Sequence, residues 1–389
     1  MAACATGAAC AGGAMWHADG TSLRDGQGRP VHITGVNLGN WLMLEGWMLD
    51  GAFLGSESRM LERIADVSGK DAARDFLARY QDLYITENDV ALMARAGFNT
   101  LRLPINYRAL AADEDCLACD RQGWRHIDRL LGWAGAHGLH VILDMHAVPG
   151  AQAGLFTADT TLGKADYWRN KSDQARLVVI WTELARRYRA NETVAGYDLI
   201  NEPDAPSGED LLASYRTLIA AIRAADPDHM IWLEGNKAAS DLSMFREFLG
   251  PNVGYSAHMY TFPRDTRKER LAQAAQAAQR LNAPIWIGEF GQTSDAVTAQ
   301  SVRMMDDTPG VVGWSYWTWK RGAVQTSAPC LLDWPSAWKS VAPWITGGML
   351  RARPAPQAAS LGIAEMLRYL EQARCQPEPG IMAALQGKR

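Results

Sequence analysis

Acidic, basic and aromatic residues stand at the ends of apolar segments at several places along the chain. Two of them are glutamates: Glu202 follows an apolar run that ends in Asn201, and Glu289 follows the run Pro-Ile-Trp-Ile-Gly. Two carboxyl groups facing one pocket can hydrolyse a glycosidic bond, because one protonates the leaving oxygen while the other attacks or activates water. Similar positions hold Arg102, Asp144, His146, His258, Tyr260 and Trp317.

The segments that carry these residues are short, apolar and β-branched, and they alternate with longer helical patterns. Such alternation predicts βα units and a parallel sheet, whose strands are buried on both faces. Eight units in one chain predict an α/β fold, a single (β/α)8 TIM barrel with long βα loops around the active site. The predicted strands are Ile33–Gly39, Thr100–Ile105, His140–His146, Val194–Asn201, Met230–Glu234, Val253–Tyr260, Pro284–Gly291 and Gly310–Trp319. The predicted helices include Glu87–Arg95, Trp124–Ala136, Ala175–Tyr188, Leu211–Ala224, Arg267–Gln279 and Leu361–Ala373.

The fold places the two glutamates on opposite sides of the barrel mouth. Side chains at the C-terminal ends of barrel strands converge on one pocket. Glu202 ends the fourth predicted strand and Glu289 the seventh. We therefore expect their carboxyl groups to approach to about 5–5.5 Å, the spacing of retaining glycosidases.

The chain resembles glycoside hydrolase family 5, the cellulase-like family. The motifs that carry the resemblance are GVNLGNWLMLEGWM, GFNTLRLPINY, HGLHVILDMHAVPGAQ, YDLINEP, SAHMY, WIGEFG and GWSYWTWK, which span Gly35 to Lys320 in the family's order. The chain looks most like the exo-β-1,3-glucanase branch, in which NLGNWL followed by an acid (here Glu45) and a His-x-x-Pro-Gly-x-Gln pattern (here 146–152) recur.

The resemblance implies roles for individual residues. Glu202 matches the catalytic acid/base, Glu289 the nucleophile and Asn201 the residue that hydrogen-bonds the sugar 2-hydroxyl. Arg102 and Tyr260 match the residues that contact the nucleophile, and a nearby positive charge lowers the pKa of a carboxyl group.

Four further positions match sugar-binding or supporting residues of the family. His258 matches a histidine near the acid/base, His146 a sugar-contacting histidine and Trp317 the platform under the sugar in the cleavage subsite. Glu45 matches an acid that binds hydroxyls of the terminal sugar; the alternative for Glu45 is a surface position or the first turn of a helix. Asp144 is expected to support His146.

These roles predict a retaining β-glycosidase that acts on β-glucan or a β-glucoside by double displacement. The mechanism requires a raised pKa for Glu202 and a lowered one for Glu289. Alternatives within the family are an endo-β-1,4-glucanase, a mannanase or a transglycosylase; a non-catalytic carbohydrate-binding barrel is an alternative of another class. No cofactor is implied, and the chain lacks metal-ligand spacing such as H-E-x-x-H.

Composition narrows the possible partners. The 39 Lys and Arg nearly balance the 43 Asp and Glu, giving a net charge of −4, so there is no electrostatic argument for nucleic acid. No apolar run reaches the roughly eighteen residues of a membrane-spanning helix. The expected partner is a β-linked saccharide, and the oligomeric state is not indicated. The chain contains fifteen Trp. Two roles are expected for them, packing in the core and stacking on sugar rings.

The two ends of the chain and its cysteines complete the domain prediction. Residues 2–14 contain only Ala, Cys, Gly and Thr, so residues 1–14 are set aside as an artefactual or disordered arm. Residues 15–376 form the predicted catalytic domain and 377–389 a loose tail. No secretory signal is readable, although the substrate class favours a secreted or periplasmic protein. Cys116 and Cys119 form a lone C-x-x-C pair, either disulfide-bonded or free, and the states of Cys330 and Cys375 are open.

Overall fold

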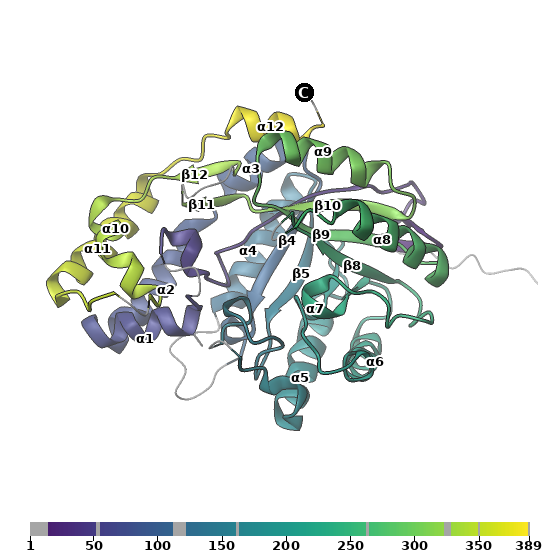
Figure 1. Cartoon of the computed structure of the whole chain (residues 1–389), viewed down its shortest axis with the longest axis horizontal. Helices are drawn as coiled ribbons and strands as arrows, with labels where there is room; N and C mark the ends of the chain where they lie inside the picture. The colour runs from purple at the N-terminus through teal and green to yellow at the C-terminus, as the bar shows by residue number, and fades with distance from the viewer. Residues whose placement is uncertain are drawn as a thin grey trace, which may run out of the picture.

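The computed structural model describes residues 15–51, 55–111, 122–160, 163–261, 264–322, 328–348 and 351–387. Its centre is a closed barrel of eight parallel strands, in the order β10-β3-β4-β5-β6-β7-β8-β9 (Figure 1). The strands are β3 (Ile33–Asn37), β4 (Thr100–Asn106), β5 (His140–Ala147), β6 (Val194–Asp198), β7 (Ile231–Glu234), β8 (Val253–Met259), β9 (Ile285–Gly291) and β10 (Val311–Trp317). Each predicted strand overlaps one of them, and the predicted (β/α)8 barrel is confirmed.

The strand register brings charged side chains of neighbouring strands to the same level of the barrel. Asp144 of β5 pairs with Asp198 of β6, and His258 of β8 pairs with Glu289 of β9. Because all eight strands run in the same direction, their C-terminal ends lie at one rim. The charged residues of the predicted site therefore gather at that rim.

Helices cover the outside of the barrel and connect successive strands. The helix α3 (Glu87–Arg95) begins with a capping box in which Thr86 and Asp89 each accept a hydrogen bond from the other's main-chain N–H. The remaining helices of the ring are α4 (Gln122–Ala136), α5 (Lys171–Tyr188), α6 (Gly208–Ala225), the short α7 (Asn236–Ala239), α8 (Arg267–Leu281) and α9 (Asp295–Asp306).

Four more helices pack together beside the barrel and stabilise its two longest loops. They are α1 (Glu57–Ser68), α2 (Lys70–Tyr84), α10 (Ser336–Ile345) and α11 (Pro356–Gln372). The first two follow β3 and the last two follow β10, so the start and the end of the barrel domain meet in this group (Figure 1). The connection from β3 to α1 also contains Glu45 and the 3-10 helix η1 (Gly46–Leu49).

The residues after Gln376 differ from the expected loose tail. They form the helix α12 (Pro379–Leu385), which packs against α9. Ile381, Ala384 and Leu385 are buried in that contact. Their spacing of three and four residues is that of one helical face, a signal that the Pro and Gly residues at 377–380 obscured.

Two small sheets lie outside the barrel. One pairs β1 (His17–Asp19) with β2 (Ser22–Arg24). The other is parallel and pairs β11 (Lys320–Gly322) with β12 (Cys330–Leu332). The second sheet directly follows the rim residue Trp317 and extends the end of the barrel towards α10.

Some sequence predictions fall beyond the described residues. Both the 1–14 arm and the Cys116–Cys119 pair lie outside them. Across the helices that the structure does describe, none has the length and apolar character needed to cross a membrane. Several tryptophans form the core, with Trp41, Trp314 and Trp319 almost fully buried.

Candidate active site

The two glutamates named from the sequence meet at the barrel rim. Glu202 lies just after β6 and Glu289 near the end of β9. One side-chain oxygen of each, together with a ring nitrogen of His258, forms a group whose atoms all lie within 4.8 Å of one another. A short separation between two carboxyl groups is typical of retaining glycosidases, in which one carboxylate attacks the sugar carbon directly. Inverting glycosidases have a wider separation, which leaves room for a water molecule.

Glu289 is held by two strong hydrogen bonds. Arg102 Nη1 donates to its Oε1 at 2.6 Å, and the Tyr260 hydroxyl donates to its Oε2 at 2.7 Å. Both partners were assigned to this carboxylate from the sequence. A guanidinium and a phenol that donate to both oxygens fix the orientation of the carboxylate and the direction of its lone pairs.

Glu202 has a different environment and an unusual main chain. Its φ of 42° lies in the left-handed region, which costs a residue with a Cβ about 1–3 kcal/mol. Its main-chain N–H donates to Glu234 Oε2 at 2.6 Å, and its Oε1 lies 3.0 Å from His258 Nδ1. The glutamate is thus held from both its main chain and its side chain.

The pKa of Glu202 differs from the sequence expectation. Burial raises the pKa of this carboxyl, but the hydrogen bond and the positive charge of His258 outweigh burial and leave the pKa below that of an ordinary glutamate. The reverse holds for His258: burial lowers its pKa, yet Glu234 and Glu289 raise it well above its usual value. Both shifts favour the charged forms, a carboxylate on Glu202 and an imidazolium on His258.

Arg102 is the centre of a buried acidic cluster. Its guanidinium donates to five side-chain oxygens: those of Asn37 (3.0 Å), Asp198 (2.9 Å), Asn201 (2.8 Å), Glu234 (3.0 Å) and Glu289 (2.6 Å). Asp144 lies 3.1 Å away. Because carboxylates outnumber cations here, burial and neighbouring acids raise the pKa of Asp144 well above its usual range and that of Asp198 to about 7, despite Arg102.

Three carboxyl groups of this cluster have the spacing of a metal site. Oxygens of Asp144, Asp198 and Glu234 are close enough together to hold an ion. The Arg102 guanidinium contacts all three carboxyl groups at 2.9–3.1 Å. It already supplies the positive charge that these groups need, so they do not fit a resident metal.

A second part of the site consists of two stacked and almost fully buried aromatic rings. His146 and Trp317 stack with ring centroids 5.4 Å apart and planes at 12°. Asp144 Oδ2 lies 2.8 Å from His146 Nδ1, and Asn201 Nδ2 lies 3.4 Å from its Nε2. Burial lowers the pKa of His146 to about 4, so the ring is neutral at neutral pH.

Glu45 lies beside this stack and is buried, so it is not a surface residue; it immediately precedes the 3-10 helix η1, but its side chain does not cap that helix. Its Oε1 is 3.9 Å from His146 Nε2, and its Oε2 accepts from Trp47 Nε1 at 2.8 Å. Burial raises the pKa of Glu45 to about 8, although the Trp47 hydrogen bond opposes the shift. Glu45 Oε1 is buried and has no hydrogen-bond partner among the described residues.

Two acidic residues and one amide of this site were not predicted from the sequence. Asp198 and Asn37 both bind Arg102, and Glu234 contacts Arg102, His258 and the Glu202 main chain. Glu234 ends a predicted strand, so the rule that selected Glu202 and Glu289 also applied to it. Asp198 ends β6 in the structure, but it lies inside the predicted strand Val194–Asn201, where no sequence signal distinguished it.

Comparisons with known proteins show the family to which the chain belongs. A family model described as cellulase (glycosyl hydrolase family 5) matches residues 65–322. A β-xylosidase of Phanerodontia chrysosporium is 30% identical over 333 residues, which cover 77% of this chain and 70% of that protein. A protein of Aspergillus clavatus named "Probable glucan 1,3-beta-glucosidase A" is 31% identical over 236 residues, covering 59% of this chain and 55% of that protein. The chain thus spans little more than half the length of this second relative.

A solved structure extends the comparison at the level of the fold. The rutinosidase of Aspergillus niger has a TM-score of 0.66 against this chain at 17% identity, covering 77% of this chain and 93% of that one. At that identity the likeness concerns the fold alone.

Proposed function

This chain belongs to glycoside hydrolase family 5 and is a glycoside hydrolase that acts on β-glycosides, and from this premise we propose that it cleaves β-glucosidic bonds with retention of configuration. The observation that carries the proposal is the approach of Glu202 and Glu289 to within 4.8 Å. Glu289 acts as the nucleophile and Glu202 as the acid/base.

In the first step Glu289 attacks the anomeric carbon while the leaving oxygen receives a proton from Glu202. The hydrogen bonds from Arg102 and Tyr260 keep the Glu289 carboxylate aimed at the anomeric carbon until attack. In the second step Glu202 removes a proton from water, which displaces Glu289 from the sugar carbon. The two inversions together give net retention.

The proton for the first step comes through His258. His258 Nδ1 and Glu202 Oε1 are 3.0 Å apart, so one proton can move between them without any rearrangement. When a sugar displaces water from the site, the local dielectric constant falls. A Glu202 carboxylate beside a His258 imidazolium then becomes less favourable than the neutral pair. Substrate binding thereby moves the proton onto Glu202, where the leaving oxygen needs it.

Glu234 positions this machinery without touching the sugar. One of its oxygens accepts the Glu202 main-chain N–H at 2.6 Å, and the other lies 3.0 Å from Arg102 Nη2 and 3.2 Å from His258 Nε2. A single carboxylate therefore links the acid/base, its proton partner and the guanidinium that holds the nucleophile. We assign Glu234 as a positioning residue for both halves of the reaction.

For the substrate we propose a terminal β-glucosyl unit of a β-1,3-linked glucan or a β-glucoside. The proposal assigns the stacked rings of Trp317 and His146 to the wall against which the sugar ring lies. The buried, unpartnered Oε1 of Glu45 is placed to bind a sugar hydroxyl, and its raised pKa lets it donate as well as accept. An acid that binds the hydroxyls of the terminal sugar would favour release of terminal units, and a relative is named "Probable glucan 1,3-beta-glucosidase A".

The direct test of the mechanism is Glu289→Ala assayed with an aryl β-glucoside. Loss of the nucleophile is expected to lower kcat by at least about 10³-fold. Added azide, which fits the space of the missing carboxylate, should restore turnover and give a glycosyl azide of inverted configuration. Glu192→Ala, which alters an exposed glutamate at the opposite end of the barrel, is the control. Full hydrolysis by Glu289→Ala, or binding of the glucoside by the wild-type protein without release of phenol, would refute the proposal.

The substrate proposal has a separate test in the products formed from soluble β-1,3-glucan. Glucose as the sole early product is expected. Viscosity that falls faster than reducing ends appear would identify an endo-acting enzyme, and preference for β-1,4-glucan or mannan would replace the proposed substrate while leaving the mechanism intact.

A further inference from the structure

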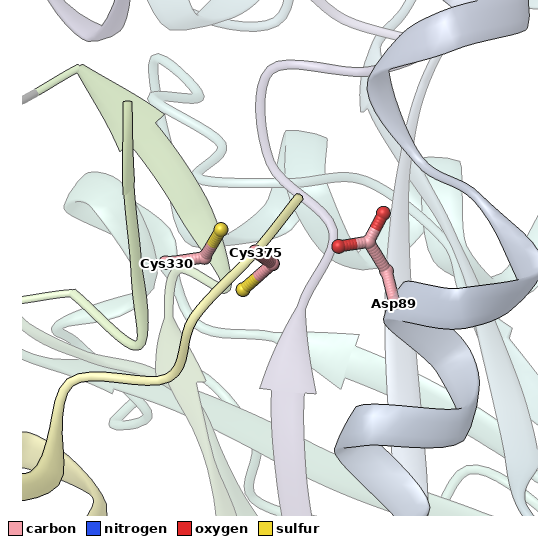
Figure 2. A group of neighbouring side chains, drawn as sticks. All are labelled: Asp89, Cys330 and Cys375. Atoms are coloured by element: carbon pink, nitrogen blue, oxygen red, sulfur yellow. The ribbon is translucent and has the colours of Figure 1, made fainter. Parts of the chain in front are cut away.

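Two cysteines from distant parts of the chain lie side by side, away from the candidate active site. Cys330 begins β12 and is buried, whereas Cys375 lies in the connection between α11 and α12 and is half-buried. Their sulfur atoms and an oxygen of Asp89 all lie within 4.8 Å of one another. Figure 2 shows the Cys375 side chain between Cys330 and Asp89. Both cysteines are free thiols in this structure.

The main chain holds the two thiols together. Glu378 N–H, just before α12, donates to Pro329 O at 2.9 Å, and Cys330 N–H donates to Trp319 O at 2.9 Å. The C-terminal connection therefore lies along the start of β12, and β12 is itself attached to the end of the barrel. The hydrogen bond between the thiols is the main cause that raises the pKa of Cys375, with burial second.

A metal ion does not fit this group, because Asp89 is already fully engaged. Its Oδ2 accepts from Lys320 Nζ at 2.7 Å and from the Thr86 main-chain N–H at 2.9 Å, and its Oδ1 accepts from Trp319 Nε1 at 3.1 Å. Lys320 supplies the positive charge that balances the carboxylate. Two thiols remain beside this closed ion pair, and their natural joint chemistry is oxidation to a disulfide.

We propose that Cys330 and Cys375 form a disulfide when the protein encounters a small-molecule disulfide. Cys375, the more exposed thiol, loses its proton to solvent and attacks one sulfur of the oxidant, whose S–S bond breaks and releases one thiolate. Cys330 then gives its proton to the released thiolate, and its own thiolate attacks the Cys375 sulfur of the mixed disulfide; that S–S bond breaks and releases the second thiolate, which takes a proton from solvent. Overall, two protein thiols are oxidised to one disulfide and one small disulfide is reduced to two thiols.

The surroundings permit the movement that the bond requires. A disulfide brings two sulfur atoms to about 2.05 Å, so the thiols must approach further. Cys330 is fixed in β12, but residues 373–378 have no regular secondary structure and can shift. The bond would tie the segment that leads into α12 to the small sheet that follows Trp317, closing a long loop that contains α10 and α11.

The decisive experiment maps this bond in the intact protein. The purified chain is equilibrated with oxidised glutathione, its free thiols are alkylated, and unreduced peptides are analysed by mass spectrometry. We expect a cross-linked peptide pair containing Cys330 and Cys375 that disappears after reduction. The double variant Cys116→Ser, Cys119→Ser, which removes the C-x-x-C pair, should give the same cross-linked peptide pair. Alkylation of both Cys330 and Cys375, or glutathione left on Cys375, would overturn the proposal.

Thermal unfolding gives a second measurement, which compares oxidised with reduced wild-type protein. Because the bond closes a long loop in the unfolded chain, oxidised protein should have a Tm about 5 °C above reduced protein. Cys375→Ser should abolish the difference. Equal Tm values for oxidised and reduced wild-type protein would contradict the proposal, as would one equivalent of Zn²⁺ retained by the reduced wild-type protein but not by Cys375→Ser. Neither result depends on the glycosidase assignment.

Discussion

Buried aspartate–histidine pairs occur in two regions of this molecule, and they behave in opposite ways. At the rim, His146 Nδ1 lies 2.8 Å from Asp144 Oδ2; just before β7, His229 Nδ1 lies 2.6 Å from Asp226 Oδ2. Burial acts to raise the pKa of both aspartates. The pKa of Asp144 does rise well above its usual value, whereas His229 and other donors bring that of Asp226 down to about 2.

The neighbours of each pair explain the difference. Asp226 also accepts hydrogen bonds from the Tyr197 hydroxyl at 2.6 Å and from the main-chain N–H groups of Asp228 and His229 at 3.0 and 3.1 Å. Donors therefore surround its negative charge.

Asp144, in contrast, shares one guanidinium with other acids. Arg102 also binds Asp198, Glu234 and Glu289. A cluster with more acids than cations is unfavourable for folding and is retained where it serves a reaction. We therefore expect an aspartate–histidine pair to contribute to function at the rim and to stability just before β7.

Among the variants that test this comparison, Glu234→Gln at the rim is expected to have the largest effect. An amide cannot accept from Glu202 N–H with one end and balance Arg102 and His258 with the other, so the Glu202 main chain and the shared proton lose their support. We expect kcat to fall about 10–100-fold, with KM nearly unchanged. The free energy of unfolding should not fall, because a negative charge leaves an acidic cluster. The measurement is kcat, KM and the pH dependence of kcat/KM on an aryl β-glucoside.

Asp198→Asn is the matched variant for this experiment. Asp198 binds Arg102 at 2.9 Å, as Glu234 does at 3.0 Å, but the structure shows no bond from Asp198 to Glu202 or His258. It should therefore leave the pH profile of kcat/KM closer to wild type than Glu234→Gln does. Identical profiles for Glu234→Gln and the wild type would show that Glu234 does not position the acid/base.

The next largest effect is expected from Asp226→Asn, and it should appear in stability alone. The lowered pKa of Asp226, about 2 against a model-compound value of 3.8, means that folding favours its ionised form. Losing that charge should reduce the free energy of unfolding by about 2 kcal/mol at pH 7. The wild-type advantage is present above about pH 4 and is lost as the pH falls through about 2.

Denaturant unfolding at several pH values measures this difference, and kcat at 25 °C should match the wild type. A variant that is as stable as the wild type at pH 7, or one that is folded but inactive, would remove the contrast between the two pairs.

The sequence predicted the barrel and most of its site because both follow from local patterns. Every barrel strand was an apolar segment, and polar residues at strand ends must converge in a closed barrel. Contacts that depend on register across strands were not predictable. Asp198 faces Arg102 only because β6 sits at a particular height beside β5, and the pKa of Glu202 depends on a histidine placed by a distant strand. The pairing of Cys330 with Cys375 likewise needs the path of the C-terminal chain.

The smallest effect is expected from Glu45→Gln, which tests whether the acidic rim lowers stability. Burial holds the pKa of Glu45 near 8, against 4.5 for an ordinary glutamate. The folded protein therefore binds a proton that the unfolded chain releases, so this residue's contribution to stability is complete below about pH 4.5 and is lost as the pH rises towards 8.

A glutamine at position 45 can still accept from Trp47 and carries no proton to lose. We expect it to raise the free energy of unfolding at pH 8 by about 1 kcal/mol, since its unpartnered amide offsets part of the gain, and to have less effect at pH 5. Denaturant titrations at both pH values provide the measurement, with Glu62→Gln on the exposed side of α1 as the control. A gain of equal size at pH 5 and pH 8 would mean that Glu45 is ionised in the folded protein, and the difference between the rim and the Asp226 region would then rest on Asp144 and Asp198 alone.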